Sequence, residues 1–396
     1  MIAVYLSPGY LLLCIYLLWR MLVWLEKCCP MLGKKRVRIP VILIYIAAVF
    51  CILIAFLLGP SDIRRLLKQF SNGWLGVMLY ALLVTATADL VRLILKRFAF
   101  PGKEKLFSPK GHRIVGAICV LCISVLSVGG IRNADNLQVT DYELYVDKEA
   151  GGLDSLNIVL VADLHMGYSI GTRQIRQMVD RINQEEPDLV VIAGDIFDNE
   201  YEALEDPEAL AEILSGIRSR YGVYACYGNH DVEERILAGF TFASKEEKAS
   251  DPRMDAFLEA AGIRLLRDEG VLIEDAFYLY GRPDYNRPGR GIKIRKTPAQ
   301  ITETMDLTKP VIVLDHEPRE LQELADAGVD IDLCGHTHDG QMFPGNLVVR
   351  FFWENSYGYL LKDGMHNIVT SGVGVFGPDM RVGTKCEMCR IVVRFR

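Results

Sequence analysis

Five short apolar runs in the second half of the sequence are each followed by Asp, His or Asn side chains. The groups begin at Asp163, Asp195, Asn229, Asp315 and His336. Five of the seven histidines of the chain belong to these groups, and isolated structural histidines would not gather in this way. Side chains of these types bind metal ions and transfer protons, so the sequence predicts a site of metal-dependent acid–base chemistry.

The expected ligands are imidazole nitrogens and carboxylate or amide oxygens without thiolate, which suits Mn, Fe or Zn, and we favour Mn. A catalytic zinc commonly takes only three protein ligands, fewer than these groups provide. Two divalent ions about 3.5–4 Å apart can hold the attacking and leaving oxygens of a phosphoryl transfer. We therefore expect two divalent metal ions. The candidate ligands are Asp163, His165, Asp195, Asn229, His316, His336 and His338.

The apolar runs that carry these groups predict the strands of a layered α/β domain. Loops at the carboxyl ends of strands form the site in such sheets, so five strands would deliver side chains to one edge. Gly194, Gly228 and Gly335 would let the backbone turn sharply after three of them. Strands are predicted at residues 156–162, 189–193, 223–227, 311–314, 330–334, 347–350, 367–370 and 390–395, and helices at 172–184, 207–220 and 318–327.

In this order the motifs D-x-H, G-D-x-x-D, G-N-H-D, H and G-H-x-H resemble those of the calcineurin-like metallophosphoesterases. The likeness covers about residues 137–395 and looks closest to the bacterial membrane-associated branch, whose last motif continues as G-H-T-H-G-G-Q. This chain has Asp339 in place of a glycine, which we expect to alter the rim of the pocket and not the metals. The motifs read here Asp163 to His165, Gly194 to Asp198, Gly228 to Asp231, His316, and Gly335 to His338.

The resemblance implies a four-layer sandwich, in which two β-sheets are flanked by helices. It also implies hydrolysis of a phosphoester by a hydroxide that two metal ions activate. One ion would take Asp163, His165 and His338, the other Asn229, His316 and His336, and both would share Asp195.

The resemblance further implies roles for three residues outside the ligand set. His230 would stabilise the transition state or protonate the leaving oxygen. Asp198 and Asp231 would orient the ligands, as carboxylates behind metal-binding groups commonly do.

Four apolar segments in residues 1–132 are long enough to cross a bilayer, which takes roughly 17–25 residues. They would form an all-α transmembrane region ahead of the calcineurin-like domain, which we expect at residues 133–396. Asp89 and Arg92 lie three residues apart in the third segment, and we expect a local ion pair near the membrane surface. The segments are residues 2–25, 41–58, 74–95 and 114–131.

The two parts of the chain differ in charge. Residues 1–132 hold 17 Lys and Arg against 4 Asp and Glu, whereas residues 133–396 hold 27 against 46. An acidic domain repels nucleic-acid phosphates, so we expect no nucleic-acid partner. The links between segments one and two and between three and four are the most basic, and basic loops stay cytoplasmic. We therefore predict a multi-pass protein of the cell membrane with its catalytic domain outside the cytoplasm.

Two stretches of the second half leave alternatives open. Residues 282–296 carry six basic side chains and one acid. They predict either a solvated loop or a clamp for an anionic lipid or phosphate-rich substrate through Arg287 and Arg290. The aromatic residues between 343 and 359 predict core packing, with an apolar wall for a lipid tail or an interfacial belt as the alternatives.

These features predict a membrane-anchored, metal-dependent phosphoesterase. Its substrate would be a phosphodiester, phosphomonoester or pyrophosphate at the lipid bilayer, lipid-linked or part of the envelope. The alternatives are a membrane sensor or scaffold with a non-catalytic domain, and a transporter. The intact candidate ligands disfavour the first, and the acidic domain with few charges inside the apolar segments disfavours the second. No protein partner is inferred from the sequence.

Overall fold

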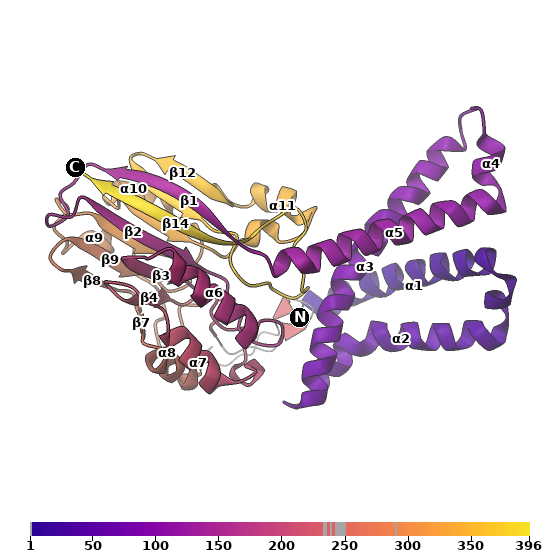
Figure 1. The fold of residues 1–396 in the computed structure, drawn as a ribbon, viewed down its shortest axis with the longest axis horizontal. Coiled ribbons are helices and arrows are strands. Elements are labelled where there is room, and N and C mark those ends of the chain that lie inside the picture. The colour runs from indigo at the N-terminus through magenta and orange to yellow at the C-terminus, as the bar shows by residue number, and fades with distance from the viewer. Residues whose placement is uncertain (1, 233–235, 238–239, 242–250, 290) are drawn as a thin grey trace. The chain divides into compact units, whose positions relative to one another are not determined.

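The computed structural model describes residues 2–232, 236–237, 240–241, 251–289 and 291–396. They form two compact units, the first made mainly of residues 1–132 and the second mainly of residues 133–396. Figure 1 shows the first unit as long helices and the second as layered strands and helices.

The first unit contains four helices that are long and apolar enough to span a membrane. The third begins at Asp62, well before the predicted start of its apolar segment, because Ser61 caps it by accepting a hydrogen bond from the Arg64 amide at 3.3 Å. The bilayer association predicted for this region follows from these helices. The helices are α1 (Ile2–Cys28), α2 (Lys35–Leu57), α3 (Asp62–Leu95) and α5 (Pro109–Ala134), with the short η1 (Pro30–Gly33) and α4 (Lys103–Phe107) between them.

Charged side chains inside this helical unit pair between helices. Asp89 of α3 forms an ion pair with Arg20 of α1 at 2.8 Å and accepts a hydrogen bond from the Tyr16 hydroxyl at 2.8 Å. Arg92 lies 3.0 Å from the His112 ring of α5. The predicted local pair of Asp89 and Arg92 is therefore wrong, because partners on neighbouring helices satisfy both side chains.

The second unit contains two six-stranded sheets of mixed direction. The first sheet has the order β1-β14-β2-β3-β4-β7, and its strands are β1 (Leu137–Val146), β2 (Ser155–Val161), β3 (Leu189–Ala193), β4 (Val223–Cys226), β7 (Ile263–Leu265) and β14 (Cys386–Phe395). The second has the order β12-β13-β11-β10-β9-β8, and its strands are β8 (Glu269–Ile273), β9 (Phe277–Gly281), β10 (Val311–Leu314), β11 (Ile331–Cys334), β12 (Gly358–Lys362) and β13 (Met365–Val369). The separate pair of β5 (Ile236–Leu237) and β6 (Phe240–Thr241) belongs to the first unit.

Helices cover the outer faces of both sheets, so the unit has four layers. The central core lies between the sheets, where Ile158 and Val191 of the first meet Leu314 and Leu333 of the second. On the outside of the first sheet lie α6 (Thr172–Gln184), α7 (Pro207–Ser215) and α8 (Pro252–Ala260), and on the outside of the second lie α9 (Pro298–Thr302) and α10 (Leu321–Asp326). The predicted two-sheet sandwich preceded by apolar helices is confirmed.

One predicted strand, at residues 347–350, is wrong. The apolar run instead forms the short helices α11 (Gly345–Val348) and η4 (Val349–Phe351), which follow η3 (His338–Gly340). A four-residue apolar run does not by itself distinguish a strand from a helix. The edge strands β1, β7, β8 and β12, and β9 inside the second sheet, were not predicted from the sequence. The short η2 (Tyr201–Ala203) precedes α7.

Candidate metal centre

The predicted ligands follow the carboxyl ends of β2, β3, β4, β10 and β11, and several have unusual backbone conformations. The φ angles are 54° at Asp163, 45° at His165, 51° at Asp195, 73° at His336 and 51° at His338. Left-handed conformations of residues with a Cβ cost roughly 1–3 kcal/mol each and cluster at functional sites. Five of the residues that the sequence predicts as ligands therefore have a strained backbone.

A first group consists of Asp163, His165 and His338. One ligand atom from each lies within 4.8 Å of the others. The two Nε2 atoms of the histidines are 3.1 Å apart, and His338 Nε2 is 3.6 Å from Asp163 Oδ1. All three side chains are buried, and burial lowers the pKa of His165 to about 3, so its ring is neutral. A neutral ring offers a lone pair to a cation.

A second group surrounds His316, where the three atoms next to Nε2 are all acceptors or lone-pair nitrogens. His316 Nε2 lies 3.1 Å from Asp195 Oδ2, 3.2 Å from Asn229 Oδ1 and 3.1 Å from His336 Nδ1. Its other nitrogen, Nδ1, donates to the Ala193 carbonyl at 2.8 Å, so Nε2 carries the lone pair of the neutral ring. Asp195 Oδ2 is also 3.7 Å from His165 Nε2, which places it between the two groups.

This second group requires a positive charge at its centre, because several lone pairs otherwise face one another. Burial lowers the pKa of His316, but the nearby Asp195 carboxylate outweighs it and raises that pKa well above its usual value. In the metal-free chain a proton on His316 can therefore supply the charge. Burial lowers the pKa of His336 to about 3, so its ring is neutral and one of its two nitrogens carries a lone pair. The donor set fits a divalent cation in place of that proton.

The three glycines of the motifs are required for two different reasons. Gly194 has a φ of 76°, so the predicted sharp turn holds there. Gly228 and Gly335 are needed for close approach instead. A Cβ on Gly228 would lie 2.3 Å from Asp195 Oδ1, and one on Gly335 would lie 2.8 Å from Asp163 Oδ2.

His230 lies beside the first group without belonging to it. Its ring centroid is 5.1 Å from that of His165 and 4.5 Å from that of Phe376. Nδ1 of His230 donates to the Asn199 side-chain oxygen, whose amide nitrogen in turn donates to the Val232 carbonyl at 3.0 Å. Asn199 thus fixes the ring orientation of His230, a role that the sequence did not indicate because Asn199 stands outside the motif spacing.

The two carboxylates predicted to orient ligands lie in different surroundings. Asp231 is fully buried and accepts hydrogen bonds from the amides of Ile196 and Phe197 at 2.9 Å and of Gly228 at 2.7 Å. It thereby joins the loop after β3 to the loop after β4. Asp198 lies with His165 and His230, with one ligand atom of each within 4.8 Å of the others.

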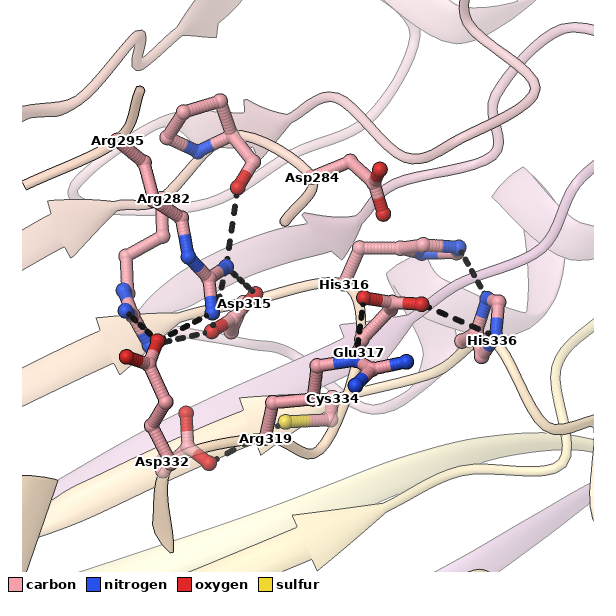
Figure 2. Close-up of polar contacts among 12 residues, drawn as sticks. Arg282, Asp284, Arg295, Asp315, His316, Glu317, Arg319, Asp332, Cys334 and His336 are labelled. Carbon is pink, nitrogen blue, oxygen red and sulfur yellow. Dashed lines mark hydrogen bonds and ion pairs between the residues drawn. The ribbon is translucent and has the colours of Figure 1, made fainter. Parts of the chain in front are cut away.

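Glu317 is a further buried carboxylate at the site, directly after His316. Its Oε1 lies 3.5 Å from His336 Nε2, and its Oε2 accepts a hydrogen bond from Arg319 Nε at 2.8 Å (Figure 2). The Arg319 guanidinium also lies 4.8 Å from the ring centroid of Trp353. The contact to Glu317 favours a proton on His336 Nε2, which leaves Nδ1 for a cation. No motif of the sequence marked Glu317.

The basic stretch 282–296 is divided between two environments. Arg282 and Arg295 are buried and form ion pairs with Asp315 at 2.7 and 3.0 Å and with Glu320 at 2.6 and 2.7 Å. Figure 2 shows both arginines directed toward Asp315, on the side away from His336. A solvated loop is therefore the wrong description for these two residues.

The two predicted substrate contacts lie between the buried arginines in the sequence. Arg287 is partly buried, and its Nη1 donates to the Asn229 carbonyl at 3.1 Å, so it lies beside the loop that carries a candidate ligand. Arg290 lies outside the described residues.

Asp339, which replaces a glycine of the family motif, is buried and has a φ of 49°. Its backbone thus keeps the left-handed conformation that glycine adopts readily. Burial raises the pKa of its carboxyl to about 6. The substitution therefore places an acid in the chain turn directly after His338.

Comparison with known proteins agrees with this geometry. A family model described as calcineurin-like phosphoesterase matches residues 156–340. A transmembrane protein with metallophosphoesterase domain from Danio rerio is 28% identical over 389 residues, which cover 93% of this chain and 83% of that protein. An uncharacterized metallophosphoesterase from Aquifex aeolicus is 30% identical over 261 residues, which cover 65% of this chain and 92% of that protein.

A third relative carries a more specific name. UDP-2,3-diacylglucosamine pyrophosphatase LpxG from Chlamydia trachomatis is 24% identical over 239 residues, which cover 52% of this chain and 70% of that protein. The buried groups of facing nitrogen and oxygen atoms lie within residues 156–340, which the family model matches. The chain is accordingly a member of the calcineurin-like metallophosphoesterase family, a family of metal-dependent hydrolases.

Proposed function

We propose that the protein is a membrane-anchored phosphoesterase of the bacterial membrane-associated branch, with residues 1–132 as its anchor and residues 133–396 as its catalytic domain. It hydrolyses a phosphodiester, phosphomonoester or pyrophosphate bond in a lipid-linked or envelope substrate. The observation that carries this proposal is the set of acceptor atoms around His316 Nε2, all within 3.2 Å, which only a cation or a proton can hold together.

Seven side chains are assigned to two divalent cations, of which Mn is favoured over Fe and Zn. Bound there, the cations would supply Lewis-acid activation of a water molecule and neutralise charge on the phosphoryl oxygens. The pairing of Asp195 Oδ2 with both histidine groups supports its role as the shared ligand. One cation is assigned Asp163, His165 and His338, the other Asn229, His316 and His336, and both share Asp195.

His230 is assigned the proton transfer at the substrate. Because its Nδ1 donates to Asn199, Nε2 is the nitrogen that would give a proton to the leaving oxygen or a hydrogen bond to the transition state. Asp231 holds the two ligand loops together, and Asp198 lies next to His165 and His230. Arg287, beside Asn229, is the proposed contact for an anionic substrate group.

The substrate class is supported by two observations of different kinds. The chain carries four helices that can span a bilayer, which would hold the domain at a lipid surface. One relative is named as a pyrophosphatase of UDP-2,3-diacylglucosamine, a nucleotide-linked compound that carries two acyl groups. The basic links between spans support a domain outside the cytoplasm, which a reporter fused to the C-terminus would test; a cytoplasmic signal would refute it.

The activity is tested with the full chain in lipid nanodiscs, using bis-p-nitrophenyl phosphate and added Mn²⁺. Wild type should hydrolyse it only with the metal. Asp195→Asn should lose the activity together with bound metal, and His230→Ala should lower turnover by about 10²–10⁴-fold with metal retained. His366→Ala is the matched control, because His366 contacts Tyr359 and the Tyr145 carbonyl, away from the metal groups.

Two outcomes would contradict the proposal. Wild type that binds Mn²⁺ yet shows no metal-dependent turnover on this ester, on a monoester or on a lipid pyrophosphate would favour the sensor or scaffold. Equal turnover of His230→Ala and His366→Ala would remove His230 from the reaction.

A further inference from the structure

The metal groups lie at the edge of the second unit where the chain arrives from its last apolar helix. Helix α5 ends at Ala134, and β1 begins at Leu137. Leu137 is paired with Cys386, at the start of β14. Strand β14 runs antiparallel to β2, with Cys389 opposite Leu160 near the end of β2. The start of β1 therefore shares an edge with the end of β2, two residues before Asp163.

This topology limits the distance between that edge and the apolar helix. Three consecutive Cα–Cα steps join Ala134 to Leu137, and they can span at most about 11 Å. The limit follows from the covalent chain alone. If α5 crosses the bilayer, the start of β1 lies within this distance of the end of that helix.

The same edge carries an exposed apolar surface, here called the 343–352 surface. It follows His338 in the sequence, and the Phe343 amide donates to the Val382 carbonyl at 2.8 Å, just before β14 begins. Figure 1 shows α11 at the end of the sheets where β1 begins. The exposed fractions of its side chains are 47% for Phe343, 49% for Leu347, 50% for Val348, 86% for Phe351 and 76% for Phe352.

This exposure contradicts the prediction of core packing for Phe351 and Phe352 and leaves two alternatives, an apolar wall for a lipid tail and an interfacial belt. Contiguous exposed apolar side chains mark interaction surfaces in soluble domains. Aromatic rings favour the interface between lipid tails and headgroups. Arg350, which is exposed between the apolar residues, carries the charge that anionic headgroups attract.

We propose that the 343–352 surface docks into the headgroup region of the lipid bilayer on the side that faces the catalytic domain. Docking there holds the metal edge against the membrane. Together with the proposed function, on which this consequence rests, it makes the substrate a lipid that stays in the leaflet while its phosphoester is cleaved.

Docking itself is tested without any enzyme activity. The full chain is placed in nanodiscs that contain a phospholipid with a diazirine on its acyl chain, and lipid adducts are mapped by mass spectrometry after illumination. Adducts should appear on peptides of residues 343–352 as well as on the apolar helices. Tyr145 is the control, because it is 53% exposed and lies near the far end of β1, opposite Arg394.

Two variants sharpen the mapping. The double variant Phe351→Ser/Phe352→Ser should lose the adducts on this surface, while Tyr145→Ser should keep them. Both change exposed side chains, and a thermal melt verifies that each folds. Labelled helices without adducts on residues 343–352 would overturn the proposal. Two chains per nanodisc with this surface unlabelled would assign it to a second copy of the chain instead.

A kinetic measurement tests the consequence for the substrate. The ratio of turnover on a phospholipid ester in the nanodisc to turnover on bis-p-nitrophenyl phosphate should fall about tenfold or more in the double Phe variant, because each buried phenyl ring is worth at least that factor. An unchanged ratio would overturn the role in substrate access. Adducts on the surface without hydrolysis of either ester would refute the proposed function and leave the docking intact.

Discussion

Asp315 and His316 are neighbours in the sequence, yet they belong to two buried polar clusters of opposite kinds. Asp315 joins Arg282, Arg295 and Glu320, where each charge meets an opposite one within 3.0 Å. His316 joins a cluster in which the neighbouring atoms are acceptors or lone-pair nitrogens. The first cluster is complete by itself, whereas the second requires a cation or a proton.

The pKa directions follow this difference. Burial alone would raise the pKa of Glu320, but hydrogen bonds from Arg295 and Arg282 hold it below its usual value. Burial, against the opposing effect of His316 and with a further contribution from nearby Asp195, raises the pKa of Asp163 to about 7 in all. A buried carboxylate with a strongly raised pKa marks a candidate functional site where, as here, other candidate metal ligands surround it.

The largest expected effect follows from opening the complete cluster. Arg282→Met leaves Asp315 and Glu320 with one arginine, and an uncompensated buried charge costs about 3–5 kcal/mol of unfolding free energy. Urea denaturation of the full chain in detergent measures it. The control is Arg173→Met, which removes an exposed pair with Asp135 and should cost about 1 kcal/mol or less. Similar losses for both variants would mean that the cluster does not depend on mutual neutralisation.

The second prediction concerns the cluster around His316, which requires a cation or a proton and is here called the open cluster. Mn²⁺ at about 100 times its dissociation constant should stabilise the wild-type chain by about 2.7 kcal/mol for each occupied site, because it binds only the folded state. Arg282→Met should keep this increment on its lower baseline, and Asp195→Asn should lose most of it. Thermal melts with and without Mn²⁺ measure both, and an equal increment in Asp195→Asn would refute the shared ligand.

The third prediction concerns Glu317, which follows His316 directly in the sequence. Glu317→Gln removes the carboxylate next to His336 Nε2, and loss of such partners typically costs 10–100-fold in metal affinity, about 1.4–2.7 kcal/mol. Calorimetric titration should show one of two Mn²⁺ sites weakened. Glu354→Gln is the matched control, since it affects an ion pair with Lys362 whose carboxylate is half exposed. Two unchanged sites would exclude an orienting role for Glu317.

The sequence predicted the open cluster better than the complete one. Ligand groups follow directly after buried strands, so local pattern predicted which strands would bring Asp163, Asp195 and His316 to one edge. The partners that orient these ligands could not be predicted in this way. Asn199 and Glu317 contact their histidines through the fold, and no spacing in the sequence distinguishes them from ordinary polar residues.

The complete cluster shows the limit most clearly. The six basic residues of the stretch 282–296 predicted a single loop environment for all of them. Arg282 and Arg295 are instead buried, because they form ion pairs with Asp315 and Glu320. In the same way, Asp89 and Arg92 contact Arg20 and His112 on other helices and not each other. Charge composition predicts where a segment tends to lie, whereas the identity of each partner depends on tertiary contacts.

The smallest predicted effect concerns Arg287, and the test is whether this side chain contacts the substrate or only stabilises the loop that carries Asn229. If it contacts substrate, Arg287→Ala should raise KM for an anionic lipid ester two- to tenfold, the equivalent of about 0.5–1.5 kcal/mol for one hydrogen bond. Metal affinity should stay unchanged, and Arg287→Lys should recover part of the loss through its charge. An unchanged KM with weaker Mn²⁺ binding would instead make Arg287 a tie to the Asn229 carbonyl, and so a structural group like Arg282 and Arg295.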